Sequence, residues 1–168
     1  TAAPGPCAAI CALTLSGLPS DRFIFAGFPP SAKGARFEML SDLAPVPATL
    51  ILYESPKRLR ALLADLVRTH GADRQAAVCR ELTKRFEEVA RGPLGTLAAD
   101  FAQREVKGEI VVLVDRAADV EASAASVEVA LDAALATMSV KDAATFVSQT
   151  LNVSRKIVYR IALDRSQG

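Results

Sequence analysis

The sequence predicts an α/β protein, a mixed five-stranded sheet with flanking helices, followed by a small all-helical helix-turn-helix tail. Three observations support this fold class. Apolar runs of strand length alternate with helical patterns up to residue 115, the composition turns small and acidic over residues 116–125, and only helical patterns follow. With 168 residues, 51% of them hydrophobic, the chain is long enough to bury a core.

Composition excludes several classes of protein. The chain carries 20 Lys and Arg against 19 Asp and Glu, which argues against a disordered polyelectrolyte and against a surface that coats nucleic acid as a whole. No apolar stretch approaches the roughly 20 residues that span a bilayer. Three cysteines without a C-x-x-C pair, and His70 as the single histidine, predict neither a disulfide scaffold nor a metal site. We therefore expect a cytoplasmic protein without a metal.

The first predicted elements are a helix, a strand, a helix and a strand over residues 6–15, 22–28, 33–43 and 48–54. Pro6 suits the first turn of a helix, and Ser16-Gly17 ends it. Cys7 and Cys11 share one face of that helix, and we expect two small buried thiols. The strands read RFIFAGF and ATLILYE, while the second helix has apolar residues at core spacing.

The next elements are a helix over residues 56–69, strands over 76–82 and 87–91, a helix over 94–105 and a strand over 109–115. Ser55 is expected to cap the first of these helices with its hydroxyl, because Pro56 has no N–H to lose. Gly92-Pro93 is expected to break the chain after the fourth strand. The last strand, EIVVLVD, is nearly all apolar, which predicts a central position in the sheet.

The predicted domains are an α/β domain over residues 1–117, a linker over 118–125 and a helical domain over 126–168. Helices are expected over residues 127–137, 141–151 and 154–164. Ser139 and Asp142 form an S-x-x-D capping box, and Asn152 suits a left-handed turn. Apolar residues predicted to pack between the last two helices are Ala144, Val147, Leu151, Val153, Ile157, Val158 and Ile161. The pattern predicts a helix-turn-helix, whose basic outer face either contacts nucleic-acid phosphates or is simply solvated.

Three segments of the α/β domain place polar groups at strand ends, where ligands collect in such sheets. They are Tyr53-Glu54-Ser55, the charged run 80–85, and Lys107-Gly108-Glu109, in which a glycine would let a ligand approach the backbone. Each is also compatible with a solvated loop. None of them alone specifies a reaction.

Taken together, several segments resemble one family. GPCAAICALTLSGLPSDRFIFAGFPP, KGAR, TLILYESPKRL, RELTKRFEEVARGPLGTL and KGEIVVLVD occur here in the order found in the bacterial 16S rRNA cytidine 2′-O-methyltransferases. These are class III S-adenosylmethionine enzymes of the tetrapyrrole (corrin/porphyrin) methylase superfamily. The resemblance covers essentially the whole chain and implies the C-terminal domain of that fold. Because the sequence starts at Thr1 and lacks the family's glycine-rich N-terminal loop, we expect a fragment that is inactive alone.

The resemblance also implies roles for particular residues. S-adenosylmethionine is the implied cofactor, and its implied contacts are Pro6, Cys7, Ala8, Tyr53, Glu54, Gly108, Glu109 and Ile110. Glu81 and Lys84 are the candidate catalytic pair, one to orient or accept a proton and the other to hold a phosphate. The implied RNA contacts are Lys33, Arg36, Arg58, Arg85, Arg155, Lys156 and Arg160. The implied partners are 16S rRNA in the small ribosomal subunit and a second copy of the chain.

Three other functions stay open at this point. A non-enzymatic regulator would join a ligand-sensing α/β domain to a helix-turn-helix that reads duplex DNA. A tetrapyrrole methyltransferase would share the fold, but such members commonly have methionine where this chain has Glu54, which favours RNA. A plain interaction domain would bind neither cofactor nor nucleic acid.

Overall fold

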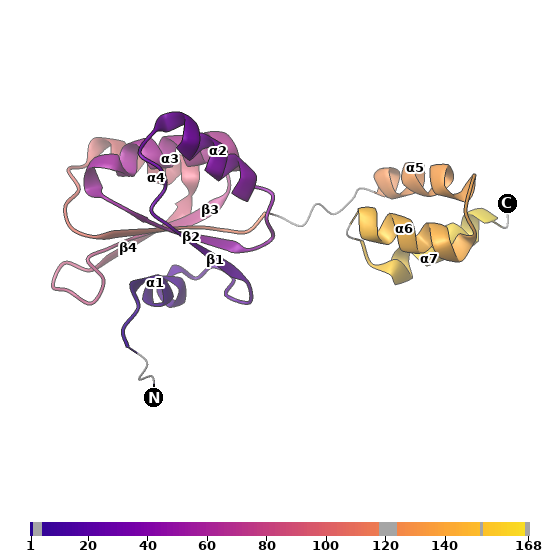
Figure 1. Cartoon of the computed structure of the whole chain (residues 1–168), viewed down its shortest axis with the longest axis horizontal. Helices are drawn as coiled ribbons and strands as arrows, with labels where there is room; N and C mark the ends of the chain where they lie inside the picture. The colour runs from indigo at the N-terminus through magenta and orange to yellow at the C-terminus, as the bar shows by residue number, and fades with distance from the viewer. Residues whose placement is uncertain (2–4, 118–123, 152, 167–168) are drawn as a thin grey trace. The chain divides into compact units, whose positions relative to one another are not determined.

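The computed structural model describes residues 1, 5–117, 124–151 and 153–166. The chain divides into two compact units, Thr1–Ala117 and Ala118–Gly168 (Figure 1). The expected linker over residues 118–125 lies mostly outside the described residues, and residues 124 and 125 already belong to a helix. No helix in the described ranges is long and apolar enough to cross a membrane.

The first unit alternates helices and strands, as the sequence predicts. Its elements are α1 Ala8–Ser16, β1 Phe23–Gly27, α2 Lys33–Leu43, β2 Thr49–Glu54, α3 Pro56–His70, β3 Gln75–Arg80, β4 Glu88–Pro93, α4 Leu94–Gln103 and β5 Ile110–Val114. The five strands form one mixed sheet in the order β1-β2-β5-β3-β4. β1 and β2 are parallel, and the other neighbours are antiparallel. β5 is central and buried along its whole length, which confirms its predicted position.

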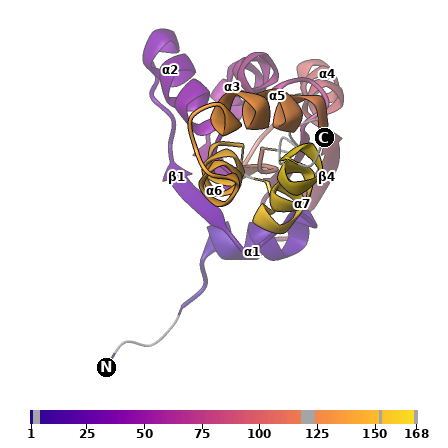
Figure 2. The ribbon, with the colours of Figure 1, turned by 90° about the vertical axis from the view of Figure 1, so that its right-hand side faces the viewer.

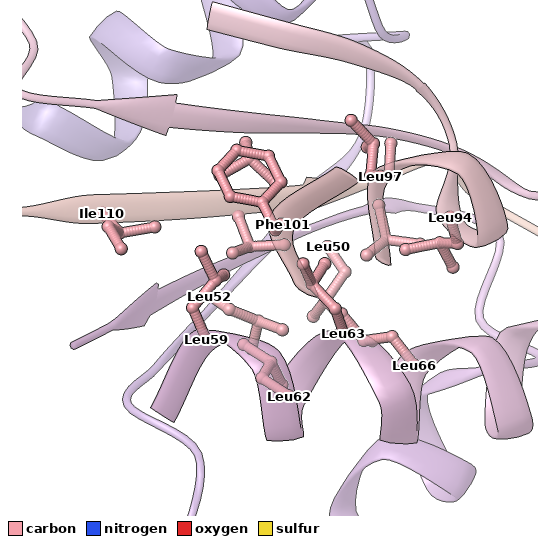
Figure 3. Packing of buried hydrophobic residues seen from close by; sticks show 14 of the residues in the cluster. Leu50, Leu52, Leu59, Leu62, Leu63, Leu66, Leu94, Leu97, Phe101 and Ile110 are labelled. Carbon is pink, nitrogen blue, oxygen red and sulfur yellow. The ribbon is translucent and has the colours of Figure 1, made fainter. Parts of the chain in front are cut away.

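Side chains alternate between the two faces of the sheet, and each face has its own core. Figure 1 shows α2, α3 and α4 on one face and α1 on the other. On the three-helix face, leucines of α3 point toward β2 and α4 (Figure 3); the labelled core residues are Leu50, Leu52, Leu59, Leu62, Leu63, Leu66, Leu94, Leu97, Phe101 and Ile110. On the α1 face, Ile51, Ala77 and Leu113 pack against Ala12 and Leu13. β2 is thereby packed on both of its faces.

Two local expectations are wrong. Ser55 is the residue before α3, but its hydroxyl makes no capping hydrogen bond. The helix begins at Pro56 without a side-chain cap. Gly92-Pro93 does not break the chain after β4: the strand continues through Pro93, because its residues pair with β3 up to the point where α4 begins.

The second unit is a three-helix unit of α5 Ala124–Leu135, α6 Val140–Thr150 and α7 Arg155–Ser166, in which the helices pack on one another (Figures 1 and 2). Half of the predicted capping box is confirmed, since Ser139 Oγ accepts from the backbone N–H of Asp142 at 3.2 Å. The Asp142 carboxylate accepts from the Ser139 hydroxyl at 2.6 Å instead of from its backbone N–H. Ala144, Val147 and Val158 are fully buried. Ile157 is 46% exposed, so its predicted core position is wrong. Asn152 lies outside the described residues.

Candidate functional site

A cavity of about 480 Å³ opens where β2 ends and β5 begins. Antiparallel pairing sets Glu54 opposite Ile110, and this brings two of the predicted segments together. The start of α1 closes the third side. The lining residues are Ala8, Phe28, Tyr53, Glu54, Ser55, Pro56, Gly108, Glu109, Ile110 and Val111. Six of the eight predicted cofactor residues therefore line one cavity.

The other two predicted cofactor residues, Pro6 and Cys7, are exposed and do not line the cavity. They precede α1, which begins at Ala8. The expected pair of buried thiols is also wrong, because Cys7 is exposed and Cys11 is only half-buried. The buried thiol is Cys79 in β3, and burial raises the pKa of this thiol to about 11. Among the described residues, no cluster of three or more His, Cys, Asp or Glu could hold a metal ion.

Tyr53 connects the cavity to α1 and to β1. Its hydroxyl accepts a hydrogen bond from the backbone N–H of Ala9 at 3.1 Å, at the open start of the helix. Its ring meets the rings of Phe25 and Phe28 edge to face, with centroids 4.9 and 5.6 Å apart. The aromatic wall of the cavity is thus held in place by both a hydrogen bond and ring contacts.

Glu54 is the buried charge of the cavity, with 3% of its surface exposed. Its Oε1 accepts from the backbone N–H of Ser55 at 2.8 Å. Its Oε2 lies 3.2 Å from Arg58 Nη2, but it accepts no hydrogen bond within the described part of the chain. A buried carboxylate oxygen without a donor is costly unless a ligand supplies one. Apolar walls and this acceptor suit an adenosine with ribose hydroxyls to donate.

Glu81, Lys84 and Glu109 form one charged cluster beside the cavity. Glu81 Oε1 accepts from Lys84 Nζ at 3.0 Å and from the backbone N–H of Glu109 at 2.9 Å. Lys84 Nζ also donates to Glu109 Oε2 at 3.0 Å. The hydrogen bond from the Glu109 backbone and the one from Lys84 lower the pKa of Glu81. Hydrogen bonds to Glu109 and Glu81 raise the pKa of Lys84, so both groups are charged at neutral pH.

The loop that carries this cluster has an unusual backbone. Glu81 and Thr83 have positive φ angles of 50° and 63°, a region that residues other than glycine rarely adopt. Gly108 has φ 95°, and a Cβ placed there would come within 2.4 Å of the Glu81 carboxylate. From the sequence, Gly108 was expected to let a ligand approach the backbone. Glu81 occupies the space on the Cβ side of Gly108 and accepts from the Glu109 N–H, while Gly108 lines the cavity.

A second cavity, of about 680 Å³, shares Ser55, Pro56 and Gly108 with the first. Its other lining residues are Lys57, Arg60, Arg104, Glu105, Val106 and Lys107. Arg60 is held in place, because it donates to the carbonyls of Phe101 and Arg104 at 3.2 and 2.7 Å. Arg104 was not predicted from the sequence as part of this cavity. No local sequence pattern could have identified it, because 44 residues separate it from Arg60 along the chain and only the fold brings the two together.

The predicted RNA contacts of the first unit divide into two kinds. Lys33 and Arg85 are exposed. Arg36 is 6% exposed, and its Nε and Nη2 donate to Asp65 Oδ2 at 2.9 and 2.7 Å. Because this ion pair buries the guanidinium, we do not propose Arg36 as a phosphate contact. Arg58 is half-buried, and donates to the carbonyls of Pro29 and Pro30.

The predicted RNA contacts of the second unit lie on α7. Arg155, Lys156 and Arg160 are exposed, and Arg155 Nε donates to Thr145 Oγ1 of α6 at 3.0 Å. A cavity of about 310 Å³ is lined by Lys141, Arg155, Lys156 and Tyr159. Lys141 and Tyr159 were not predicted from the sequence, because only the packing of α6 on α7 brings Lys141 beside the basic residues of α7.

Two family profiles match different parts of the chain. The profile of the tetrapyrrole (corrin/porphyrin) methylases matches residues 1–98, and that of the RsmI C-terminal HTH domain matches residues 121–166. Ribosomal RNA small subunit methyltransferase I of Erythrobacter litoralis is 45% identical over 165 residues, which cover 98% of this chain and 58% of the relative. The protein of the same name from Mesorhizobium japonicum is 43% identical, with 96% and 55% covered. The chain thus spans somewhat more than half the length of these relatives.

Solved structures show the same fold at low sequence identity. The methyltransferase CobJ is 20% identical with a TM-score of 0.54, covering 68% of this chain and 50% of that one. The cobalt precorrin-4 methyltransferase CbiF is 18% identical with a TM-score of 0.51, covering 67% and 50%.

Proposed function

This chain belongs to the tetrapyrrole (corrin/porphyrin) methylases, and we propose that it supplies the cofactor pocket and RNA contacts of an enzyme that methylates small-subunit ribosomal RNA. The relatives named ribosomal RNA small subunit methyltransferase support the substrate class. The finer proposal is transfer of a methyl group from S-adenosylmethionine to the ribose 2′-hydroxyl of cytidine 1402 in 16S rRNA. A ribosomal substrate agrees with the expected cytoplasmic location.

The observation that carries the proposal is the buried, half-satisfied carboxylate of Glu54 in the cavity at the end of β2. We assign the Glu54 carboxylate to the ribose hydroxyls of S-adenosylmethionine. Ala8, Phe28 and Ile110 supply apolar walls for its adenine. When bound, the cofactor supplies an electrophilic methyl group with a neutral thioether as the leaving group. The tasks left to the protein are positioning and the removal of one proton.

Glu81 and Lys84 are proposed as positioning residues rather than as the proton acceptor and the phosphate ligand. The Glu81 carboxylate already accepts two hydrogen bonds, and the pKa of this group is lowered, which makes it a weaker base. Lys84 lies between two carboxylates, so its charge is already compensated. Both side chains instead fix Gly108 and Glu109, which line the cofactor cavity. The proton acceptor is then a group outside this cluster.

A binding measurement with a matched control tests the pocket. S-adenosylhomocysteine is titrated by calorimetry into the protein at the full length of its relatives. Glu54→Gln should weaken binding about tenfold, because loss of a charged acceptor for a hydroxyl removes a strong hydrogen bond. Glu105→Gln is the control, since Glu105 is exposed and does not line this cavity. Equal affinity of Glu54→Gln and wild type, with both folded, would contradict the assignment.

A further inference from the structure

We propose that the second unit binds one nucleotide of single-stranded RNA in the cavity formed by Lys141, Arg155, Lys156 and Tyr159. The base stacks on the Tyr159 ring, and the phosphate lies among the three cations. This inference rests on the proposed function for its choice of RNA. It adds that the second unit recognises this RNA as a single strand. It predicts binding of an unpaired strand instead of insertion of a helix into a duplex groove.

The cavity is formed by two helices that the turn brings together. Lys141 lies in the first turn of α6, and the other three residues lie in the first turns of α7. The hydrogen bond from Arg155 Nε to Thr145 Oγ1 holds Arg155 against α6. The cavity volume of about 310 Å³ is at the small end of the range for ligand pockets and suits a single nucleotide unit.

The charge of this cavity is positive and uncompensated. Its lining contains three cations and no carboxylate. Within the described part of the chain, the Lys141 and Lys156 side chains have no hydrogen bond or ion pair with another residue. Arg165, at the other end of α7, instead pairs with Glu128 at 2.9 Å and with Asp132 of α5. The basic charge of α7 is therefore neutralised at its end and open at its start, where an anion can bind.

Tyr159 is the residue that favours single-stranded over duplex nucleic acid. Tyr159 is 39% exposed and shares the cavity with the cations, so a base can stack on its ring while its phosphate contacts the ammonium groups. A helix that reads a duplex projects side chains from a convex face toward base edges. Here the side chains line a cavity that is open to solvent. Bases that are paired and stacked in a duplex cannot reach a ring at its wall, whereas an unpaired base can.

Fluorescence anisotropy with the 168-residue chain tests the inference. The probes are a short labelled oligocytidylate, the same strand in duplex RNA, and duplex DNA of equal length, all at one salt concentration. We expect the single strand to bind most tightly. Tyr159→Leu should weaken its binding about tenfold, because stacking of the base is lost, while Tyr159→Phe stays within about twofold of wild type. Val129→Ala, at an exposed site on α5 outside the cavity, is the control for the surface change.

The cations give a second readout. Lys156→Ala should reduce the dependence of log affinity on log salt by about one unit, as expected for one lost phosphate contact. Arg165→Ala should change that slope less, since Arg165 is paired with Glu128 and Asp132 and does not line the cavity. Tighter binding of either duplex, or equal binding by Tyr159→Leu and wild type, would overturn the inference.

These results are distinguishable from failure of the proposed function. If the protein does not methylate ribosomal RNA but Tyr159→Leu still weakens single-strand binding, the proposed function is wrong and the nucleotide site stands. Methyl transfer with no effect of Tyr159→Leu on single-strand binding would keep the enzyme and reject the site.

Discussion

The carboxylate of Glu81 lies against the backbone of Gly108, so closely that a Cβ at position 108 would come within 2.4 Å of Glu81 Cδ and Oε1. The same carboxylate accepts the N–H of the next residue, Glu109. Gly108 lines both cavities of the first unit. One side chain from the loop after β3 thus determines the backbone path at the entrance to β5, where the cofactor is proposed to bind.

Gly108→Ala should therefore disturb the site and the stability of the first unit. The new methyl group meets the Glu81 carboxylate, and φ 95° is strained for alanine. We expect a loss of about 1–3 kcal/mol in the free energy of unfolding and weaker binding of S-adenosylhomocysteine. Gly34→Ala is the matched control, because Gly34 lies in α2 with open space around it, and alanine favours a helix. Unfolding curves in urea measure both, and equal curves for Gly108→Ala and wild type would refute the contact.

Variants of Glu81 separate its hydrogen bond from its charge. Glu81→Gln keeps an oxygen that can accept from the Glu109 N–H, whereas Glu81→Ala removes the acceptor. Glu81→Ala should weaken cofactor binding about fivefold and speed hydrogen exchange at the Glu109 amide. Glu81→Gln should stay near wild type in both measurements. If Glu81→Gln binds cofactor normally, as expected, but abolishes methyl transfer, then Glu81 is a proton acceptor and the positioning role is wrong.

His70 predicts a dependence of stability on pH. Burial, with a smaller effect of the Arg74 charge, lowers its pKa from 6.5 to about 4. Below pH 6.5 the unfolded chain therefore binds a proton that the folded chain does not, so this contribution to stability is lost as the pH falls from 6.5 to about 4. The loss should reach about 3 kcal/mol at the lower pH.

His70→Leu is the comparison that isolates this effect, because other carboxylates titrate in both proteins. The difference in unfolding free energy between wild type and variant should change with pH over that interval. His70 is the single histidine of the chain, so its ring resonances also report the pKa directly by NMR. A measured pKa near 6.5 would contradict the burial of its ring.

Arg36 should be essential for stability and dispensable for RNA binding. Its guanidinium and the Asp65 carboxylate are both buried, and removal of either partner leaves a buried charge alone. Arg36→Ala should cost about 3 kcal/mol of unfolding free energy. Arg68→Ala, which removes an exposed guanidinium 3.8 Å from the same carboxylate, should cost less than about 1 kcal/mol. Normal stability of Arg36→Ala together with weaker RNA binding would restore Arg36 to the RNA surface.

Most elements of the fold could be predicted because their signals are local. The spacing of leucines in α3 and the apolar run of β5 depend on one segment each, and the buried side of α3 follows directly from its period. The N-cap hydrogen bond at Ser139 is also formed within four residues. The end of β4 was misjudged because pairing with β3 outweighs the local effect of Gly92-Pro93.

The site was predicted in part, and the errors have one cause. Arg36 resembles any basic loop residue until the fold brings Asp65, 29 positions away, against it. Glu81 resembles a free carboxylate, but Glu109 and Gly108 hold it in place. Lys141 and Tyr159 carry no motif at all. A sequence does not show which charged side chains form ion pairs with each other inside the fold. The charged side chains that remain unpaired are the candidates for function.

Methyl transfer from radiolabelled S-adenosylmethionine tests the central proposal most directly. The protein at the full length of its relatives is incubated with small ribosomal subunits that lack the modification, and the labelled RNA is hydrolysed with alkali. We predict label in 16S rRNA within an alkali-resistant dinucleotide, because a 2′-O-methyl group blocks cleavage at that ribose. Glu54→Gln should give less label when the cofactor concentration is limiting. Label in a base, or transfer to a corrinoid or porphyrin but not to RNA, would contradict the account.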